Sequence, residues 1–504
     1  MQVMSRLGMD DSVKSVLVLG GGSAGLIAAL TLRRLLPSLK VELVRSQEIG
    51  IIGVGEGTTA VFPTHFFDIL GIDKAEFYRE TTPTWKQGIK FIWGPREYFY
   101  YTFNFQYDQQ RAGMPLANGF YADDDCTMLD LPASLMHCGK AFATGPLGKP
   151  LIKGEYAFHI ENHKLVTYLE KIASAYDVTI HNDTLDHAVA EDGRITQLAF
   201  KSGTTRSADL IIDASGFRAE LIGKALQEPF KDFSQGLFCD RAVIGGWTRT
   251  DEPLHAYTTA ETMDAGWCWQ IEHENWINRG YVYSSAFISD ADALNEFLTK
   301  NPKVSNQPRV VPFRSGRYER NWVGNVVAVG NASGFVEPLE ATALAQLIYE
   351  VRWLIEKLKA SGFQPDPATR DDYNLLMGRA WDEIRDFLAF HYKFNTRLDT
   401  PFWRHCHEHT SLGDYESLYQ AYVRLGPSPE VVLALPYRPN IYGIEGYLSM
   451  LVGMKVPHSK SHRTTEQERE IWAKHHRAMD SRVASALSSE QVLAAIRSPH
   501  WKWA

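Results

Sequence analysis

The sequence predicts an α/β protein with a Rossmann-type first part, a mixed sheet and a mainly helical C-terminal region. Three observations predict this class. An apolar strand runs into a glycine-rich turn and a helix over residues 16–34. Strand patterns recur up to about residue 330, and helical patterns prevail beyond residue 365. We therefore expect one domain over residues 1–365 and a second, helical domain over residues 366–504.

The glycine-rich turn carries the strongest signal. Residues 16–19 are wholly apolar, which is typical of a strand buried on both faces. Gly20, Gly22 and Gly25 follow with G-x-G-x-x-G spacing, and a helical pattern continues to Arg34. These glycines permit a tight turn, close approach to a pyrophosphate and close helix packing. Because a helix N-terminus also favours phosphate, we expect a dinucleotide here.

The second strand, over residues 40–44, ends at an unusual residue for this fold. Dinucleotide folds usually place an acid there to accept from the ribose hydroxyls, but this sequence has Arg45. An arginine suits a 2′-phosphate, which indicates NADP, or it packs on an adenine. Both interpretations stay open.

Composition excludes several classes of protein. Of 504 residues, 44% are hydrophobic and 22% are charged, as in ordinary globular proteins. The net charge of −8 and the lack of a basic stripe argue against nucleic acid as a partner. Five cysteines without a C-x-x-C pair predict a reduced cytoplasmic protein with packed thiols, and no metal site is expected. Without a signal peptide or a long apolar run, we expect neither secretion nor a membrane span.

Two segments place polar or aromatic groups where they could meet a ligand. Residues 50–58 hold four glycines in the first eight positions and read as a loop that lies against a flat ligand. Residues 84–93 alternate like a strand, with Trp85 and Phe91 on one side and Lys86 on the other. Composition alone favours a solvated face for such a lysine.

Aromatic residues gather in two further segments. Residues 98–107 contain seven aromatics, which fit either a strand buried on both faces or a slot for an aromatic substrate. Residues 266–285 are strand-rich and place Trp267 and Trp269 on one face. The pattern alone favours a core role for that pair.

The remaining elements complete the expected fold. Pro338 ends any preceding helix, and the amides of residues 342–344 lie near the next helix start, which favours an anion. Glu340 beside them is out of keeping with a merely structural turn. We expect helices over 64–70, 75–81, 161–175, 344–358, 373–392, 415–424, 465–487 and 489–497, and strands over 178–180, 195–200, 208–213, 243–248 and 323–330.

These motifs resemble the flavin-dependent halogenases of the tryptophan-halogenase type. A lone glycine fingerprint is weak, but a W-x-W-x-I run, a strand lysine and P-L-E-x-T together are specific. The matching segments are residues 20–25, 53–58 (G-V-G-E-G-T), 84–91 (T-W-K-Q-G-I-K-F), 267–271 (W-C-W-Q-I), 335–342 (F-V-E-P-L-E-A-T) and 386–392 (D-F-L-A-F-H-Y). The resemblance implies a Rossmann-type FAD-binding domain of the flavin monooxygenase type, a mixed substrate sheet and a C-terminal helical region.

The resemblance also implies a two-component enzyme. A separate NAD(P)H-dependent flavin reductase supplies reduced FAD, which with oxygen oxidises chloride or bromide to hypohalous acid. The acid reaches Lys86, where an electron-rich aromatic ring is halogenated, and Glu340 supports removal of the ring proton. The halide would lie on amides at Thr342 and Ala343, and a homodimer is an open option. The residues implied to contact FAD are Gly20, Gly22, Ser23, Ala24, Gly25, Arg45, Ser46, Ile49, Glu56, Gly57, Asn331 and Leu344; those implied to line the tunnel or substrate pocket are Trp267, Trp269 and Phe103.

The residue types suit this chemistry independently. A buried lysine offers an ammonium that donates to hypohalous acid, or an amine that the acid could chlorinate. A carboxylate can take the ring proton. The tryptophan pair would keep the substrate away from the flavin, which separates halogenation from hydroxylation. The alternatives are an aromatic hydroxylase of the monooxygenase fold and a flavoprotein that binds without catalysing.

Three departures from the family pattern affect specificity. Glu272 stands where the tryptophan run normally ends in proline, and Ala343 where glycine commonly follows the threonine. The second change leaves the halide preference open. Residues 440–447 look too short for the clamp that holds the backbone of free tryptophan, so we expect an indole or phenol substrate instead.

Overall fold

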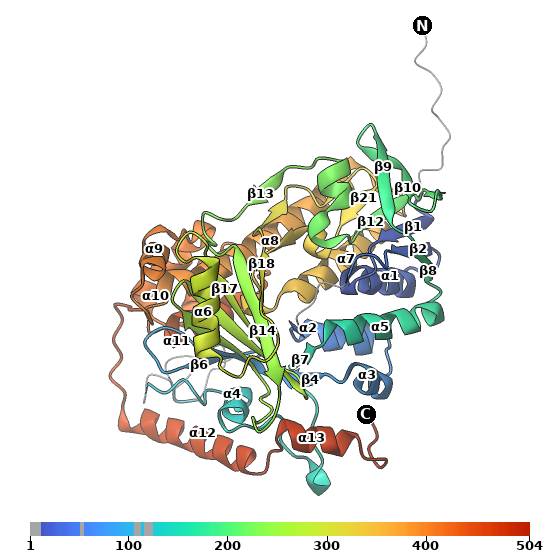
Figure 1. Ribbon diagram of the computed structural model, residues 1–504. Coiled ribbons are helices and arrows are strands. Elements are labelled where there is room, and N and C mark those ends of the chain that lie inside the picture. Colours follow the sequence, from blue (N-terminus) through green and yellow to red (C-terminus); the bar gives the residue numbers. More distant parts are fainter. Residues whose placement is uncertain (1–11, 51–54, 105–111, 115–123, 504) are drawn as a thin grey trace.

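A six-stranded, mostly parallel sheet forms the centre of the first part of the computed structural model, which describes residues 12–50, 55–104, 112–114 and 124–503 (Figure 1). β1 lies between β12 and β2 and runs parallel to both, and α1 forms the crossover from β1 to β2. The order is β20 (Trp322–Val323), β21 (Val326–Ala328), β12 (Leu210–Asp213), β1 (Ser15–Leu19), β2 (Lys40–Arg45) and β8 (Thr179–Asn182). Three helices pack together beside it: α1 (Ser23–Leu35), α5 (Asn162–Ala173) and α7 (Ala343–Ala360). The predicted Rossmann-type arrangement is confirmed.

A seven-stranded mixed sheet forms the second layer. Its strands are antiparallel except for the parallel pair β15 and β5. The order is β18 (Arg309–Pro312), β14 (Arg241–Thr248), β17 (Trp276–Tyr283), β16 (Gly266–Glu272), β15 (Thr258–Met263), β5 (Gly88–Ile92) and β6 (Phe99–Thr102). Smaller sheets contain β3 (Glu56–Gly57), β7 (Ala157–Ile160) and β4 (Thr84–Lys86); β9 (Leu185–Glu191), β10 (Arg194–Phe200) and β11 (Thr205–Arg206); and β13 (Phe230–Asp232), β19 (Gly316–Tyr318) and β22 (Gly334–Phe335).

The remaining helices lie around both sheets. α8 (Pro367–Phe394) runs from one sheet to the other, and α12 and α13 follow the lower edge of the view in Figure 1. The others are α2 (Val61–Pro63), a π-helix at Thr64–Ile69, α3 (Lys74–Thr81), α4 (Leu131–His137), α6 (Asp290–Lys300), α9 (Pro401–His409), α10 (Glu416–Leu425), α11 (Gly443–Gly453), α12 (Glu466–Ala484) and α13 (Ser489–Ile496). Within the described residues, none of the helices is both long and apolar enough to cross a membrane.

Two large apolar clusters form the core, and α8 joins them. Tyr373 and Met377 belong to the cluster under the parallel sheet. Trp381, Phe387 and Tyr392, further along α8, belong to the cluster under the mixed sheet. The expected boundary near residue 365 falls in the loop between α7 and α8. A separate domain over 366–504 stays a prediction.

The strand expected over residues 84–93 is interrupted at Gln87. The Gln87 side chain is buried, and its Nε2 donates to the carbonyl oxygen of Ala141 at 2.8 Å. The backbone N–H of Gln87 donates to the carbonyl oxygen of Ala256 at 2.7 Å. The two halves therefore join different sheets, because Gln87 leaves the ladder. Trp85 packs in the first cluster and Phe91 in the second. The prediction that they share one face is wrong.

Close packing explains a helix that the composition did not predict. α11 was not anticipated, because its three glycines lower helix propensity. A Cβ at Gly453 would lie 2.4 Å from the Phe99 ring, so the glycine is required by close packing on β6.

Two other predicted segments are described only in part. The loop predicted over residues 50–58 includes the short strand β3, and its residues 51–54 lie outside the described residues. Residues 105–107 of the aromatic run also lie outside them. Four cysteines are buried, but Cys138 is exposed, so the expectation of packed thiols is wrong there.

Candidate active site

A cleft of about 510 Å³ opens where β1 ends and α1 begins. Gly20 has φ 129°, and a Cβ there would lie 2.2 Å from the Ala214 carbonyl oxygen. A Cβ at Gly25 would lie 1.9 Å from the Gly20 carbonyl oxygen, so α1 packs directly under the turn. α1 begins at Ser23 without an acidic residue in its first turn. Its amides therefore face the cleft as a pyrophosphate site requires, and FAD fits this cradle.

Most residues that the resemblance assigns to FAD line this cleft. Gly25, Glu56 and Gly57 do not belong to the lining: Gly25 packs beneath the turn, whereas the other two lie on β3. Burial raises the pKa of Glu56 to about 7. The lining includes Gly20, Gly22, Ser23, Ala24, Arg45, Ser46, Ile49, Asn331 and Leu344.

Arg45 is already paired with side chains of the protein. Its Nε donates to Asn182 at 2.7 Å, and its guanidinium forms an ion pair with Glu170 of α5. A 2′-phosphate would have to compete with Glu170, so the NADP interpretation is not favoured. Glu170 also lines the cleft and supplies the carboxylate that the end of β2 lacks. Sequence reasoning missed it because α5 lies far along the chain from β2.

Lys86 lies at the end of β4, in the interior. Its side chain is 0% exposed, so the solvated interpretation is wrong. Nζ donates to the Thr58 carbonyl at 3.1 Å and lies 5.7 Å from the centre of the Phe103 ring. Burial lowers its pKa to about 8, while the Glu340 carboxylate acts in the opposite direction. A lysine so placed is available near neutral pH in both protonation states.

Glu340 closes a short 3-10 turn, Pro338–Glu340, immediately before α7. The carboxyl is 5% exposed, and Oε1 lies 2.7 Å from Nε2 of His391 on α8. Among the described residues, Oε2 has no hydrogen-bond partner. One carboxyl oxygen is thus fixed by His391, and the other is not bonded to any residue that the structure describes.

One member of the tryptophan pair is held by a second buried carboxyl group. Trp267 and Trp269 lie side by side on β16, with ring centres 6.1 Å apart. The indole N–H of Trp267 donates to Glu337 at 3.2 Å, and the Tyr392 hydroxyl donates to the same oxygen. Burial raises the pKa of Glu337 to about 7. Glu337 thereby ties the tryptophan strand to the turn that carries Glu340.

The expected halide position lies at the start of α7. Thr342 is the residue before the helix, and Ala343 is its first residue. Ala343 and Leu344 line the FAD cleft, whereas Thr342 lies outside that lining. The first turn of α7, which the structure describes in full, contains no acidic residue. An anion on these amides would therefore adjoin the flavin cleft.

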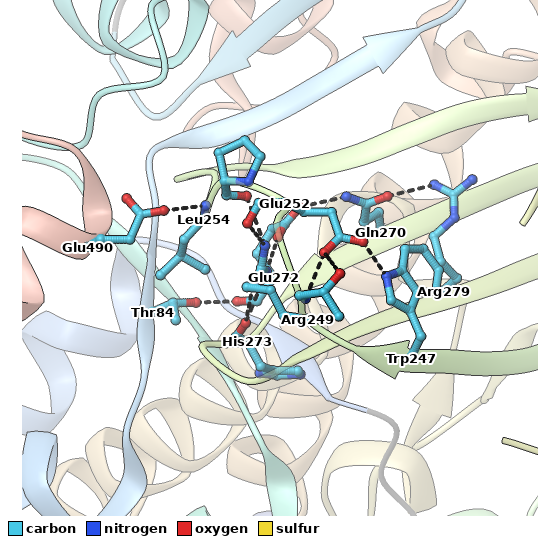
Figure 2. Close-up of polar contacts among 12 residues, drawn as sticks. Thr84, Trp247, Arg249, Glu252, Leu254, Gln270, Glu272, His273, Arg279 and Glu490 are labelled. Carbon is cyan, nitrogen blue, oxygen red and sulfur yellow. Dashed lines mark hydrogen bonds and ion pairs between the residues drawn. The ribbon is translucent and has the colours of Figure 1, made fainter. Parts of the chain in front are cut away.

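Glu272, which replaces the family's proline, is the centre of a buried polar network (Figure 2). Its carboxylate forms an ion pair with Arg249 and accepts from Gln270 at 2.6 Å. Its carbonyl oxygen accepts from the Thr84 hydroxyl. Thr84 begins β4, the strand of Lys86. The substitution therefore adds an ion pair between the tryptophan strand and Arg249. The contact with the lysine strand is made by the Glu272 backbone and does not depend on the glutamate side chain.

Sequence reasoning assigned no role to His391, Glu337 or Tyr392. A signal was present in the D-F-L-A-F-H-Y segment, because a histidine amid apolar residues in a buried helix needs a partner. The partner could not be identified, because Glu340 approaches from a different element.

Comparison with known proteins matches this geometry. The family model for tryptophan halogenase matches residues 15–470. The chain is 31% identical to a tryptophan 7-halogenase from Lentzea aerocolonigenes, over 79% of each chain. Among solved structures it is similar to MibH, a "lathipeptide tryptophan 5-halogenase", with TM-score 0.89 and 35% identity over 98% of this chain and 95% of that one. It is also similar to a flavin-dependent halogenase from Brevundimonas sp. BAL3, with TM-score 0.84 and 28% identity over 96% and 100%.

These matches support flavin-dependent halogenation of an aromatic substrate, with FAD and halide, and do not favour the aromatic hydroxylase. The chain belongs to the tryptophan halogenase family of flavin-dependent halogenases.

Proposed function

We propose that this halogenase directs hypohalous acid with Lys86 and removes the ring proton with Glu340. The observation that supports this most is the burial of Lys86, which lies beside the Phe103 ring, together with Glu340, whose charge acts on it. Burying two ionisable groups is costly, so their joint presence in a core indicates function. Near neutral pH the ammonium of Lys86 donates a hydrogen bond to hypohalous acid and so orients it.

The Rossmann cleft is the proposed FAD site. The amides of α1 hold the pyrophosphate, and Glu170 accepts from a ribose hydroxyl. Bound reduced FAD, with oxygen, supplies the oxidising power that converts halide to hypohalous acid. The start of α7, at Thr342 and Ala343, holds the halide beside this cleft, and Trp267 and Trp269 keep the aromatic substrate out of it.

Glu340 takes the proton from the halogenated ring carbon. The ring C–H bond breaks, its electron pair restores aromaticity, and the proton moves to Oε2. Glu340→Gln retains the shape of the side chain without its basicity. We expect lower turnover with some product remaining, since water takes the proton less well.

The proposed substrate is an electron-rich aromatic such as an indole or a phenol. Residues 440–447, the region of the family's clamp for free tryptophan, include the first residues of α11, which begins at Gly443. Tyr442 within them stacks on Phe387, with ring centres 3.8 Å apart. This short aromatic wall favours recognition of the ring over that of an amino-acid backbone. A panel of indole, a phenol, a tryptophan-containing peptide and free tryptophan, each with both halides, tests the assignment; exclusive use of free tryptophan would contradict it.

A separate NAD(P)H-dependent reductase is the proposed source of reduced FAD, in the cytoplasm. FAD then has to exchange, so titration should give saturable but modest affinity. The isolated chain should not oxidise NADPH. Rapid NADPH oxidation by the chain alone would exclude the two-component scheme.

A further inference from the structure

The hydrogen bonds of His391 fix the number of protons that it shares with Glu340. Nδ1 lies 3.0 Å from the Phe387 carbonyl oxygen. A carbonyl only accepts, so Nδ1 carries a hydrogen. Nε2 faces Oε1 of Glu340 at 2.7 Å. One proton therefore lies between ring and carboxyl, either on Nε2 beside a carboxylate or on Oε1 beside a neutral ring.

The surroundings make this pairing obligatory. His391 is 0% exposed, and its ring is enclosed by Phe91 and Phe387, with ring centres 5.3 and 5.0 Å away. Trp93, also close by, uses its indole N–H for the His391 carbonyl. Within the described structure, Glu340 is the ionisable partner that the imidazole reaches. The other titratable groups influenced by the Glu340 charge are Lys86, Tyr101 and Tyr442.

We propose that His391 is a positioning residue that also takes up the proton that Glu340 must release. This inference rests on the proposed role of Glu340. When the pair begins as neutral imidazole and carboxylic acid, the Oε1 proton moves to Nε2 while Oε2 accepts the proton from the ring carbon. The ring C–H bond breaks, its electrons return to the ring, and the pair ends as imidazolium and carboxylic acid. Glu340 can therefore act as a base even when it is already protonated.

Isotope substitution separates this role from a structural one. The experiment uses the full chain, reduced FAD, bromide, and indole carrying deuterium at the reacting carbon. In His391→Phe, which keeps an aromatic ring without hydrogen bonds, we expect product formation to fall by about 10- to 100-fold. A primary isotope effect should appear, because proton removal becomes rate-limiting. Hypohalous acid captured by a soluble trap, FAD affinity and oxygen consumption should be unchanged.

Two further variants make the result decisive. His391→Gln supplies an amide that donates to Oε1 but takes up no proton, so part of the rate should return while the isotope effect remains. His65→Phe is the matched control, since His65 is another buried histidine, bonded to Thr31 at 2.9 Å. It should leave the isotope effect at the wild-type value.

Each outcome has one meaning. Wild-type rates without an isotope effect in both His391 variants overturn the inference. If Glu340→Gln shows the isotope effect and the His391 variants do not, only the inference fails. If Glu340→Gln also lacks it, the proposed role of Glu340 fails first.

Discussion

The Nζ atom of Lys86 donates to the carbonyl oxygen of Thr58 at 3.1 Å, and the lysine side chain is fully buried. Thr58 ends the glycine-rich segment that follows β2, and Lys86 ends β4. The hydrogen bond therefore fixes the ammonium between two segments that are separate in sequence. A lysine held in this way is oriented before any substrate arrives.

Lys86→Ala should abolish halogenation and leave FAD binding and oxygen consumption nearly intact. A positioned catalytic group contributes roughly 10²- to 10⁴-fold, whereas removal of a solvated lysine changes stability by less than about 0.5 kcal/mol. Product yield with indole and bromide measures the difference. Lys90→Ala, on the neighbouring strand β5, is the control. Wild-type bromination by Lys86→Ala would overturn the assigned mechanism.

The rate of halogenation should decrease as the pH rises through about 8, the value to which burial lowers the pKa of Lys86. The ammonium that orients hypohalous acid is lost above that pH. Single-turnover product formation across this range tests the expectation, with the uncatalysed reaction of hypohalous acid and indole in the same buffers as the reference. A rate that increases through the same range would assign the reaction to the free amine.

Lys86→Met should raise the free energy of unfolding near neutral pH. The pKa of Lys86 falls from 10.5 in the unfolded chain to about 8 in the folded protein. Between these values the unfolded chain binds more protons, so stability increases with pH across this window and the cost of the buried cation is greatest below it. We expect a gain of about 1–3 kcal/mol at neutral pH, after loss of the bond to Thr58. Urea unfolding should show the gain shrinking towards pH ~10; a constant gain would contradict the linkage.

Glu272→Ala should destabilise the protein by about 3–5 kcal/mol, because it leaves the buried Arg249 guanidinium without its carboxylate. Replacing both residues by leucine should cost less than the single change. Denaturant unfolding measures both variants. Arg404→Ala, in an exposed pair with Asp399, is the control and should change stability by less than about 1 kcal/mol. Equal costs for the single and double variants would show that the charge pair does not matter.

Bromide should be preferred over chloride at equal concentrations. Bromide is more easily oxidised, and Ala343 adds a methyl group at the start of α7, where the family commonly has glycine. Ala343→Gly should move the product ratio towards chloride, as measured by mass spectrometry in a competition assay. Mainly chlorinated product from the unaltered chain would contradict this expectation.

Elements whose signals are local could be identified from the amino-acid sequence alone. The spacing of Gly20, Gly22 and Gly25 predicts the turn because each glycine is needed for a backbone conformation or a close approach within a few residues. Apolar runs likewise placed β1, β12 and β16, and the helical period placed α7 and α8, with ends shifted by a few residues. A resemblance in short motifs sufficed to identify Lys86 and Glu340 as candidates. These inferences depend on neighbours along the chain.

Which of these side chains contact one another depends on the tertiary structure. Lys86 is buried because β4 leaves the strand line at Gln87, and Arg45 is neutralised by Glu170 from α5. Glu340 is hydrogen-bonded to His391, which lies on α8. Each of these contacts joins residues that are far apart in sequence. Burial strengthens the interaction, because in a low-dielectric interior the charge of an ionisable group depends on its partner.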